Sequence, residues 1–401
     1  MLKLHILRAN CGDCFVLEFA KNNDKSKYIL IDGGPHGVFK NYLRPFLEKY
    51  SGIEFELVVA THSDDDHVIG LSQLVETIYA QGFSTHKLAK IKQFWYNSLE
   101  ATIENNIDKK NRLTRALQTP KKRNLELDDK KMEELFAKSM ELDEPEFLKR
   151  SYKSGLELRQ SLKDMKIPIN QGFKDELISL DSPNLTRDFD GHLLIKIIGP
   201  FQTQLDNLME KWLKWFEDYS AELKSRDIRG SLKDNTIPNL SSIMFLAEAD
   251  GKTILFTGDG LDDHILEGLR ERQILTGETM EVDVLKLPHH GSERNVSEEF
   301  FKTVLSKSYV ISGNGDYDNP SAKTLIMIAK ITKCLEREKV TIYITYDSKD
   351  IDDRKESGKN RKERLEAQLN EFRNECPEDE YPYELKTIDS DKDVLTLVLS
   401  E

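Results

Sequence analysis

The sequence predicts an α/β fold, on three observations. Short apolar runs of strand length, separated by turn residues, fill the first sixty residues. Apolar residues at helical spacing follow from Val68 to Tyr79. Strand and helix patterns alternate again after residue 192. With 38% hydrophobic residues, a chain of 401 residues can bury a sizeable core. We therefore expect a sheet that carries helices between its strands.

Turn signals bound the expected strands. Asp32-Gly33-Gly34-Pro35 ends an early strand, and Ala249-Asp250-Gly251 is typical of a hairpin turn. The expected strands span residues 2–7, 14–19, 28–31, 56–60, 193–198, 242–248, 253–257, 282–287, 309–312, 340–345 and 394–399. The expected helices span residues 68–79, 321–334 and 348–373.

Two charged segments of helical character interrupt this pattern. Residues 98–190 and 348–385 are rich in charged and helix-favouring residues, whereas the rest reads as strands and shorter helices. The chain has no internal repeat and no Gly/Ser linker. We therefore expect one α/β domain, formed by residues 1–97 and 191–401, that carries a helical insertion at 98–190 and a smaller charged helical insertion at 348–385.

The net charge of -13 limits the partners of this chain. Proteins that bind nucleic acid usually present a basic surface, so any such contact must be local here. The first insertion contains the basic cluster Lys121-Lys122-Arg123, which is either a solvated helical face or a surface that faces a substrate. No apolar run approaches the ~18 residues that cross a bilayer, so no membrane partner is expected.

The cysteines and the N-terminus indicate a cytoplasmic location. Four cysteines are too few for a disulfide scaffold, and the first ten residues lack the features of a secretory signal. Cys11 and Cys14 form a C-x-x-C pair, but no second pair completes a zinc site, so redox or metal chemistry is the less favoured interpretation. Trp212, Trp215 and Phe216 have the spacing of a helix that buries an aromatic stripe in the core.

Four potential metal ligands lie within six consecutive residues. His62, Asp64, Asp66 and His67 follow an expected strand and precede an expected helix. Imidazole and carboxylate groups suit zinc, manganese or iron(II), and a loop can direct alternate residues to two adjacent ions. A helix N-terminus would account for the acidic residues, but it would not account for the two histidines.

Two further clusters follow buried strands. Thr257-Gly258-Asp259-Gly260 places one carboxylate after a strand, between two glycines that allow close approach. Pro288-His289-His290-Gly291-Ser292 places two histidines after another expected apolar strand. Because ligands commonly bind at strand ends in open α/β sheets, these clusters predict a single site.

These motifs resemble a known family. In this order, H-x-D-x-D-H, T-G-D and P-H-H-G-S resemble the metallo-β-lactamase superfamily, and more narrowly the hydrolase domain of ComEC-type DNA-uptake proteins. The segments that resemble this branch's G-x-G-D-A turn, early aspartate strand and late N-x-Y-G-H-P-S motif are 10–14, 30–34 and 314–321. The resemblance implies a metallo-β-lactamase αββα sandwich with charged helical insertions. It covers residues 1–80, 192–200, 238–347 and the final strand, and excludes both insertions.

The resemblance also implies a set of metal ligands. They would hold one or two Zn²⁺ or Mn²⁺ ions and are His62, Asp64, Asp66, His67, Asp259 and His289. Asp66 would also act in catalysis by orienting the attacking water, and His290 would protonate the leaving oxygen. Which of the two adjacent histidines binds metal stays open at this point.

Other residues would support the ions or bind substrate. Asp32, like Asp13, would lie behind the ligands, while Ser312 and Asn314 would hydrogen-bond a substrate phosphate. Two departures leave the second ion position open. Asn319 stands where relatives carry the histidine of a His-Pro pair, and Asn239 falls near the usual third histidine.

Three functions fit these residues. The favoured one is a metal-dependent phosphodiesterase or nuclease that cleaves nucleic acid or a nucleotide through a metal-bound hydroxide, without a covalent nucleophile. The second is a hydrolase of a small lactone or thioester, for which an acidic surface is no handicap. The third is a degenerate, non-catalytic binding module with a protein partner on the helical insertion.

Overall fold

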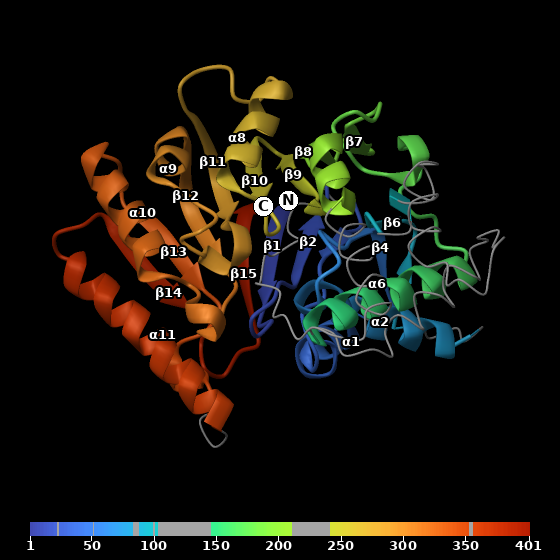
Figure 1. Cartoon of the computed structure of the whole chain (residues 1–401), viewed down its shortest axis with the longest axis horizontal. Helices are drawn as coiled ribbons and strands as arrows, with labels where there is room; N and C mark the ends of the chain where they lie inside the picture. Colours follow the sequence, from blue (N-terminus) through green and yellow to red (C-terminus); the bar gives the residue numbers. More distant parts are fainter. Residues whose placement is uncertain are drawn as a thin grey trace, which may run out of the picture.

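The computed structural model shows two β-sheets packed face to face, with helices on the outer face of each (Figure 1). It describes residues 1–21, 24–50, 52–82, 88–98, 101–102, 146–210, 241–352 and 356–401. The predictions for Lys121-Lys122-Arg123, for the Trp212 aromatic stripe and for Asn239 lie outside these residues. The layers form an αββα sandwich, which confirms the predicted fold class.

The first sheet combines the beginning and the end of the chain. Its path runs β15-β1-β2-β3-β4-β5, and β6 also pairs with β4. The strands are β1 (Leu2–Leu7), β2 (Phe15–Phe19), β3 (Lys27–Ile31), β4 (Ile53–Val59), β5 (Ala89–Ile91), β6 (Phe94–Trp95) and β15 (Val394–Ser400). Strand β15 is antiparallel to β1, with Leu4 opposite Leu397, so the two termini lie close together (Figure 1).

The second sheet has the order β14-β13-β12-β11-β10-β9-β8-β7. Its strands are β7 (Thr186–Phe189), β8 (Leu193–Gly199), β9 (Met244–Ala249), β10 (Lys252–Phe256), β11 (Met280–Lys286), β12 (Val304–Ile311), β13 (Val340–Ile344) and β14 (Tyr383–Thr387). Strands β10 to β14 are parallel, and β7 to β10 are antiparallel. The carboxyl ends of β10, β11, β12 and β13 therefore share one edge of the sandwich.

Helices cover the two outer faces. On the first sheet lie η1 (Phe39–Leu43), α1 (Arg44–Glu48), α2 (Asp65–Ala80) and α6 (Glu146–Asp164). On the second lie α8 (Asp262–Glu271), α9 (Glu298–Thr303), α10 (Ala322–Cys334) and α11 (Glu356–Glu375) (Figure 1). No described helix has both the length and the apolar composition that a membrane-spanning helix requires.

Alternating strand residues build the core between the sheets. In β2, Phe15, Leu17 and Phe19 face the second sheet, whereas Val16 packs under the helices. The Phe15 ring lies 6.1 Å from that of Phe256 on β10. This apolar layer fixes the two sheets against each other, and so it fixes the loops at their shared edge.

Sheet strands occupy part of both predicted insertions. β7 lies within the segment 98–190, and its four residues carry too little apolar alternation to stand out in the sequence. β14 begins within 348–385, extends to Thr387 and pairs in parallel with β13. Parallel neighbours need a long crossover, and α11 supplies it, so α11 belongs to the layer of helices on the second sheet.

Candidate metal centre

Loops from both sheets converge at the edge where the parallel strands end. His62 and His67 follow β4, with His67 in the first turn of α2. Asp259 follows β10, and His290 lies in the short 3-10 turn η4 (Pro288–Gly291) after β11. All four side chains are at least 95% buried. Clusters far apart in the sequence thus meet at one site.

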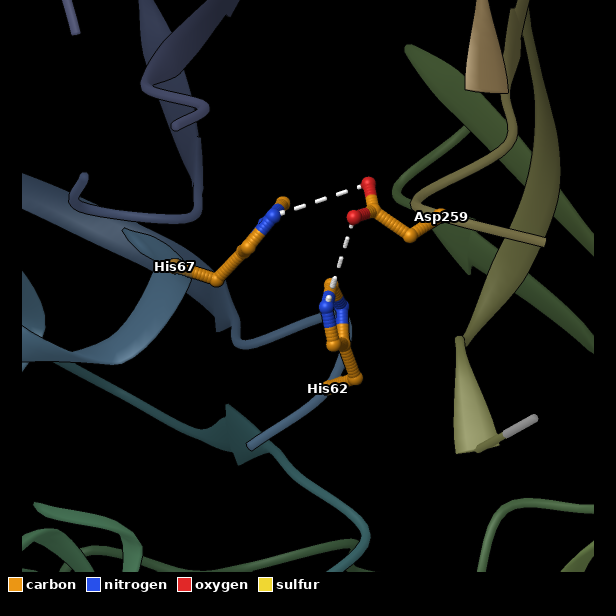
Figure 2. A group of neighbouring side chains, drawn as sticks. All are labelled: His62, His67 and Asp259. Atoms are coloured by element: carbon orange, nitrogen blue, oxygen red, sulfur yellow. Dashed lines mark ion pairs between the residues drawn. The ribbon is translucent and has the colours of Figure 1, made fainter. Parts of the chain in front are cut away.

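Asp259 faces two histidines of the opposite sheet. Its Oδ2 atom lies 3.7 Å from His62 Nε2, and its Oδ1 atom lies 3.5 Å from His67 Nε2 (Figure 2). Both imidazole rings point toward this carboxylate. These three residues form one group that could hold a metal ion.

A second group shares His67 with the first. His290 Nε2 lies 3.3 Å from Asp66 Oδ2 and 3.6 Å from Asp259 Oδ2, and His67 Nε2 lies 3.9 Å from Asp66 Oδ2. Asp66, His67 and His290 therefore form another potential ligand set. Asp259 lies against both groups, which suits a carboxylate shared between adjacent ions.

The distances between the donor atoms are better suited to coordination of a metal ion than to direct hydrogen bonds. Most of these separations exceed hydrogen-bond length. Among the described residues, no hydrogen-bond partner is found for the Nε2 atoms of His62, His67 and His290, or for Oδ1 of Asp259. A tetrahedral ion with bonds of about 2.1 Å separates its ligands by roughly 3.4 Å, close to the distances observed. The residues present therefore fit a divalent metal.

The electrostatics of the cluster also favour a cation. Burial alone would lower the pKa of the His67 imidazole, but the Asp259 and Asp32 carboxylates outweigh burial and raise that pKa well above its usual value. For the same reason, with Asp259 as the largest attractive partner, the pKa of His290 is raised to about 10. A site that draws protons onto buried imidazoles attracts metal ions as well.

In His67 and in His290, a hydrogen bond at Nδ1 orients the ring so that Nε2 faces the cluster. His67 Nδ1 donates to Asp32 Oδ2 at 2.8 Å, and Asp32 also accepts from the backbone N–H and the hydroxyl of Thr61. His290 Nδ1 donates to the backbone carbonyl of Ser312 at 3.0 Å. With Nδ1 so engaged, each ring would bind a metal ion through Nε2, as metal-binding histidines do. Asp32 thus lies behind the His67 ring, and its support of a metal ligand stays a prediction.

Comparison with known proteins agrees with this geometry. Residues 12–117 match the family model described as "Metallo-beta-lactamase superfamily", a segment that includes the His62–His67 run. The chain has a metallo-β-lactamase fold. It is also similar to ComE operon protein 3 of Bacillus subtilis (strain 168), with 31% identity over 100 residues, which is 24% of this chain and 12% of that protein. The chain therefore matches a small part of that relative.

His289 and His290 lie side by side in the turn η4 but differ in their surroundings. Both residues have left-handed backbone, with φ of 47° and 56°. The His290 side chain is 5% exposed and lies in the ligand cluster, whereas that of His289 is 26% exposed. His289 Nδ1 is 2.9 Å from Asn295 Oδ1, and its Nε2 is 3.7 Å from Asp259. The geometry thus favours His290 as the ligand, the reverse of the assignment made from sequence.

The remaining predicted residues surround the cluster at different depths. Asp64 occupies the N-cap position of α2 without a side-chain capping hydrogen bond, and its Oδ2 lies 3.6 Å from His62 Nε2. The Ser312 hydroxyl donates to the Gly12 carbonyl at 2.5 Å, so this residue braces the site instead of offering a free donor to a phosphate. Asn314 Oδ1 accepts from the N–H of Asp316, and Asn319 Nδ2 donates to the His289 carbonyl at 3.4 Å.

Sequence reasoning missed a charged residue in the metallo-β-lactamase site. Lys286 ends the apolar strand β11, is 1% exposed and forms an ion pair with Asp13. The signal for it is the single charged residue in the run Val284-Leu285-Lys286-Leu287, since a lysine amid buried residues needs a carboxylate partner. Asp13, predicted to lie near the ligands, is that partner.

The C-x-x-C pair takes no part in the centre. Burial raises the pKa values of the Cys11 and Cys14 thiols, which disfavours the reactive thiolate. Both are free cysteines, and no cysteine joins a ligand cluster in the described part of the chain. These side chains pack the turn between β1 and β2.

Asp32→Asn is expected to weaken binding of Mn²⁺ or Zn²⁺ about 10- to 100-fold, because the neutral amide no longer fixes the His67 ring through a charged acceptor. Calorimetric titration of the metal-free protein measures this loss. Asp283→Asn is the matched control, since Asp283 accepts from the Thr253 N–H on the same fold, away from the ligands. Equal affinities in Asp32→Asn and wild type would contradict the role of Asp32.

Proposed function

We propose that this metallo-β-lactamase fold is a metal-dependent phosphodiesterase that cleaves nucleic acid or a nucleotide. The observation that carries the proposal is the Asp259 carboxylate between two groups of histidines whose Nε2 atoms have no hydrogen-bond partner. A divalent ion held there supplies a Lewis acid that activates water and neutralises charge on phosphoryl oxygens. The mixed nitrogen and oxygen donors suit Zn²⁺ or Mn²⁺.

The chain's own residues would divide the work by depth. His62, His67, His290 and Asp259 are buried and hold the ions, with Asp64 beside His62. Asp66, 28% exposed and 3.3 Å from His290, reaches the solvent side and orients the attacking water.

His289 is the proposed proton donor to the leaving oxygen. Its side chain is also partly exposed, and Asn295 fixes the ring through Nδ1, so Nε2 faces the Asp259 side of the site. A general acid must reach the leaving oxygen of a substrate that enters from solvent, which a partly exposed ring can do. The pair of adjacent histidines would thus combine one ligand with one acid.

Features beside the site support a nucleic-acid substrate despite the acidic total charge. The loop around η5 (Asp316–Asp318) presents Tyr317 with 81% of its surface exposed, and Asn319 links this loop to His289. Arg361 and Arg364 of α11 lie within 4 Å of the loop carboxylates Asp316 and Asp318. Tyr317 therefore offers an exposed ring on which an unpaired base can stack, while both arginines face carboxylates of the loop.

Tyr317→Ala is expected to raise KM for a single-stranded oligonucleotide about tenfold, since stacking of one base contributes about 1–3 kcal/mol. Turnover of bis(p-nitrophenyl) phosphate should stay within twofold of the wild-type rate, because this small substrate does not reach Tyr317. Tyr79→Ala is the control, as Tyr79 is 60% exposed at the far end of α2. A parallel loss on both substrates would instead indicate damage to the metal centre.

The total charge of -13 favours a second candidate, a small-molecule hydrolase of lactones or thioesters. The two functions separate in one experiment on protein loaded with Mn²⁺ or Zn²⁺. The substrates are single-stranded DNA, duplex DNA, RNA, bis(p-nitrophenyl) phosphate and a γ-lactone. Metal-dependent cleavage of a phosphodiester supports the proposal. Lactone hydrolysis alone would replace it with the second candidate, and metal binding without any turnover would indicate a non-catalytic binding module.

A further inference from the structure

A buried ammonium group lies within the candidate metal centre. Lys286 Nζ forms its ion pair with Asp13, donates to the Gly258 carbonyl at 2.8 Å, and lies 3.7 Å from Asp259 Oδ1. An ammonium has three donors, of which Asp13 and Gly258 accept two. The carboxylate of Asp259 is the potential metal ligand with which this ammonium forms an ion pair.

Such a group is costly to bury. A lysine removed from water destabilises the fold unless charged partners surround it, and replacement of a whole buried ion pair by apolar residues is often tolerated. Two apolar side chains in place of Asp13 and Lys286 would avoid both buried charges. The arrangement therefore invites a role that needs the positive charge at this position.

The Asp259 side chain is held in an unusual way. Its backbone N–H donates to Ser242 Oγ and its backbone carbonyl accepts from Asn295 Nδ2, so the main chain is fixed. The carboxylate itself is not fixed by any described hydrogen bond at Oδ1. Its surroundings are the ligand histidines, His289 and Lys286. Lys286 is the member of this set that lies within a strand, β11, which is parallel to the strand β10 that precedes Asp259.

We propose that Lys286 is a positioning residue of the metal centre, whose ammonium, anchored on Asp13 and Gly258, holds the Asp259 carboxylate so that its two oxygens face the two histidine groups. The inference rests on the proposed function only in that the cluster binds a divalent ion. It does not depend on which bond the protein hydrolyses.

The test separates positioning of Asp259 from neutralisation of Asp13. The variants are Asp13→Asn, Lys286→Met and the double variant, and the readouts are Mn²⁺ affinity by calorimetry and thermal unfolding of the metal-free protein. Lys286→Met alone leaves a buried, unpaired carboxylate and is expected to be the least stable. The double variant removes both charges and should be at least as stable as either single variant.

The expected result is that the double variant still binds Mn²⁺ at least about tenfold more weakly than Asp13→Asn, the range seen when a group behind a ligand is lost. Binding as tight as that of Asp13→Asn, or tighter because a repelling cation is gone, would overturn the proposal. Should the methionine variants fail to fold, Lys286→Gln with Asp13→Asn keeps the polar contacts and gives the same comparison.

The matched control is Lys196→Met. Lys196 pairs with Glu248 at 2.8 Å on the same sheet, away from the ligands. The Lys196→Met protein should therefore bind Mn²⁺ with the affinity of wild type. Failure of the broader proposal has a different signature. Wild-type protein that binds no Mn²⁺ or Zn²⁺ would contradict both proposals, while metal binding without phosphodiester cleavage would contradict only the proposed function.

Discussion

Asp259→Ala is expected to lower metal-dependent phosphodiester cleavage by at least about a thousandfold. Asp259 is the carboxylate that lies against both histidine groups, within 3.7 Å of His62, His67 and His290. Its removal therefore affects every ion the centre can hold, whereas loss of a peripheral ligand affects one. Initial rates with bis(p-nitrophenyl) phosphate at saturating Mn²⁺ measure the effect.

The control for this substitution is Asp263→Ala. Asp263 lies in the first turn of α8, four residues further along the chain, and its side chain is 75% exposed. Its loss should leave the rate within twofold of wild type. Asp259→Ala protein that is as active as Asp263→Ala protein would rule out Asp259 as a ligand of the catalytic metal.

Gly70→Ala is expected to destabilise the fold by about 1–3 kcal/mol, although alanine normally favours a helix over glycine. A Cβ atom at Gly70 in α2 would meet the Gly33 carbonyl oxygen at 1.9 Å. The same contact fixes α2 to the turn after β3, where the Gly33 N–H donates to the His67 carbonyl. A displaced α2 would also move Asp66 and His67, so metal affinity should fall together with stability.

Thermal and urea unfolding of the metal-free protein measure the first effect of Gly70→Ala, and Mn²⁺ titration measures the second. Gly277→Ala is the control, because its nearest neighbour in the described structure is the Thr279 carbonyl, 4.0 Å from a Cβ atom at that position. It should be neutral or slightly stabilising. A stabilised Gly70→Ala protein would show that α2 does not need its close approach to Gly33.

The positions of the buried strands, and hence of the residues that follow them, were predicted best from the sequence. Apolar runs such as 28–31 and 253–257 correspond to β3 and β10 within one residue at each end, because both strands are buried and bounded by turn residues. Parallel strands bring their carboxyl ends to one edge. The polar residues after β4, β10 and β11 could therefore be expected to meet, and the structure brings them together.

The features that the sequence could not reveal depend on backbone direction and on contacts across the sandwich. His289 and His290 are adjacent, and only their left-handed backbone and the turn η4 decide which ring is buried in the cluster. Lys286 lies in strand β11, and its ion-pair partner Asp13 is more than 270 residues away in the sequence. The Ser312 hydroxyl is taken by Gly12 across the two sheets, a contact that no local pattern indicates.

The most direct test of the central claim is a crystal structure of the protein grown with Mn²⁺ or Zn²⁺, with anomalous diffraction measured at the metal edge. The account predicts anomalous peaks at about 2.0–2.2 Å from ligand atoms of Asp259, His62, His67 and His290. Peaks confined to surface carboxylates, with the four buried side chains unchanged and unligated, would contradict it.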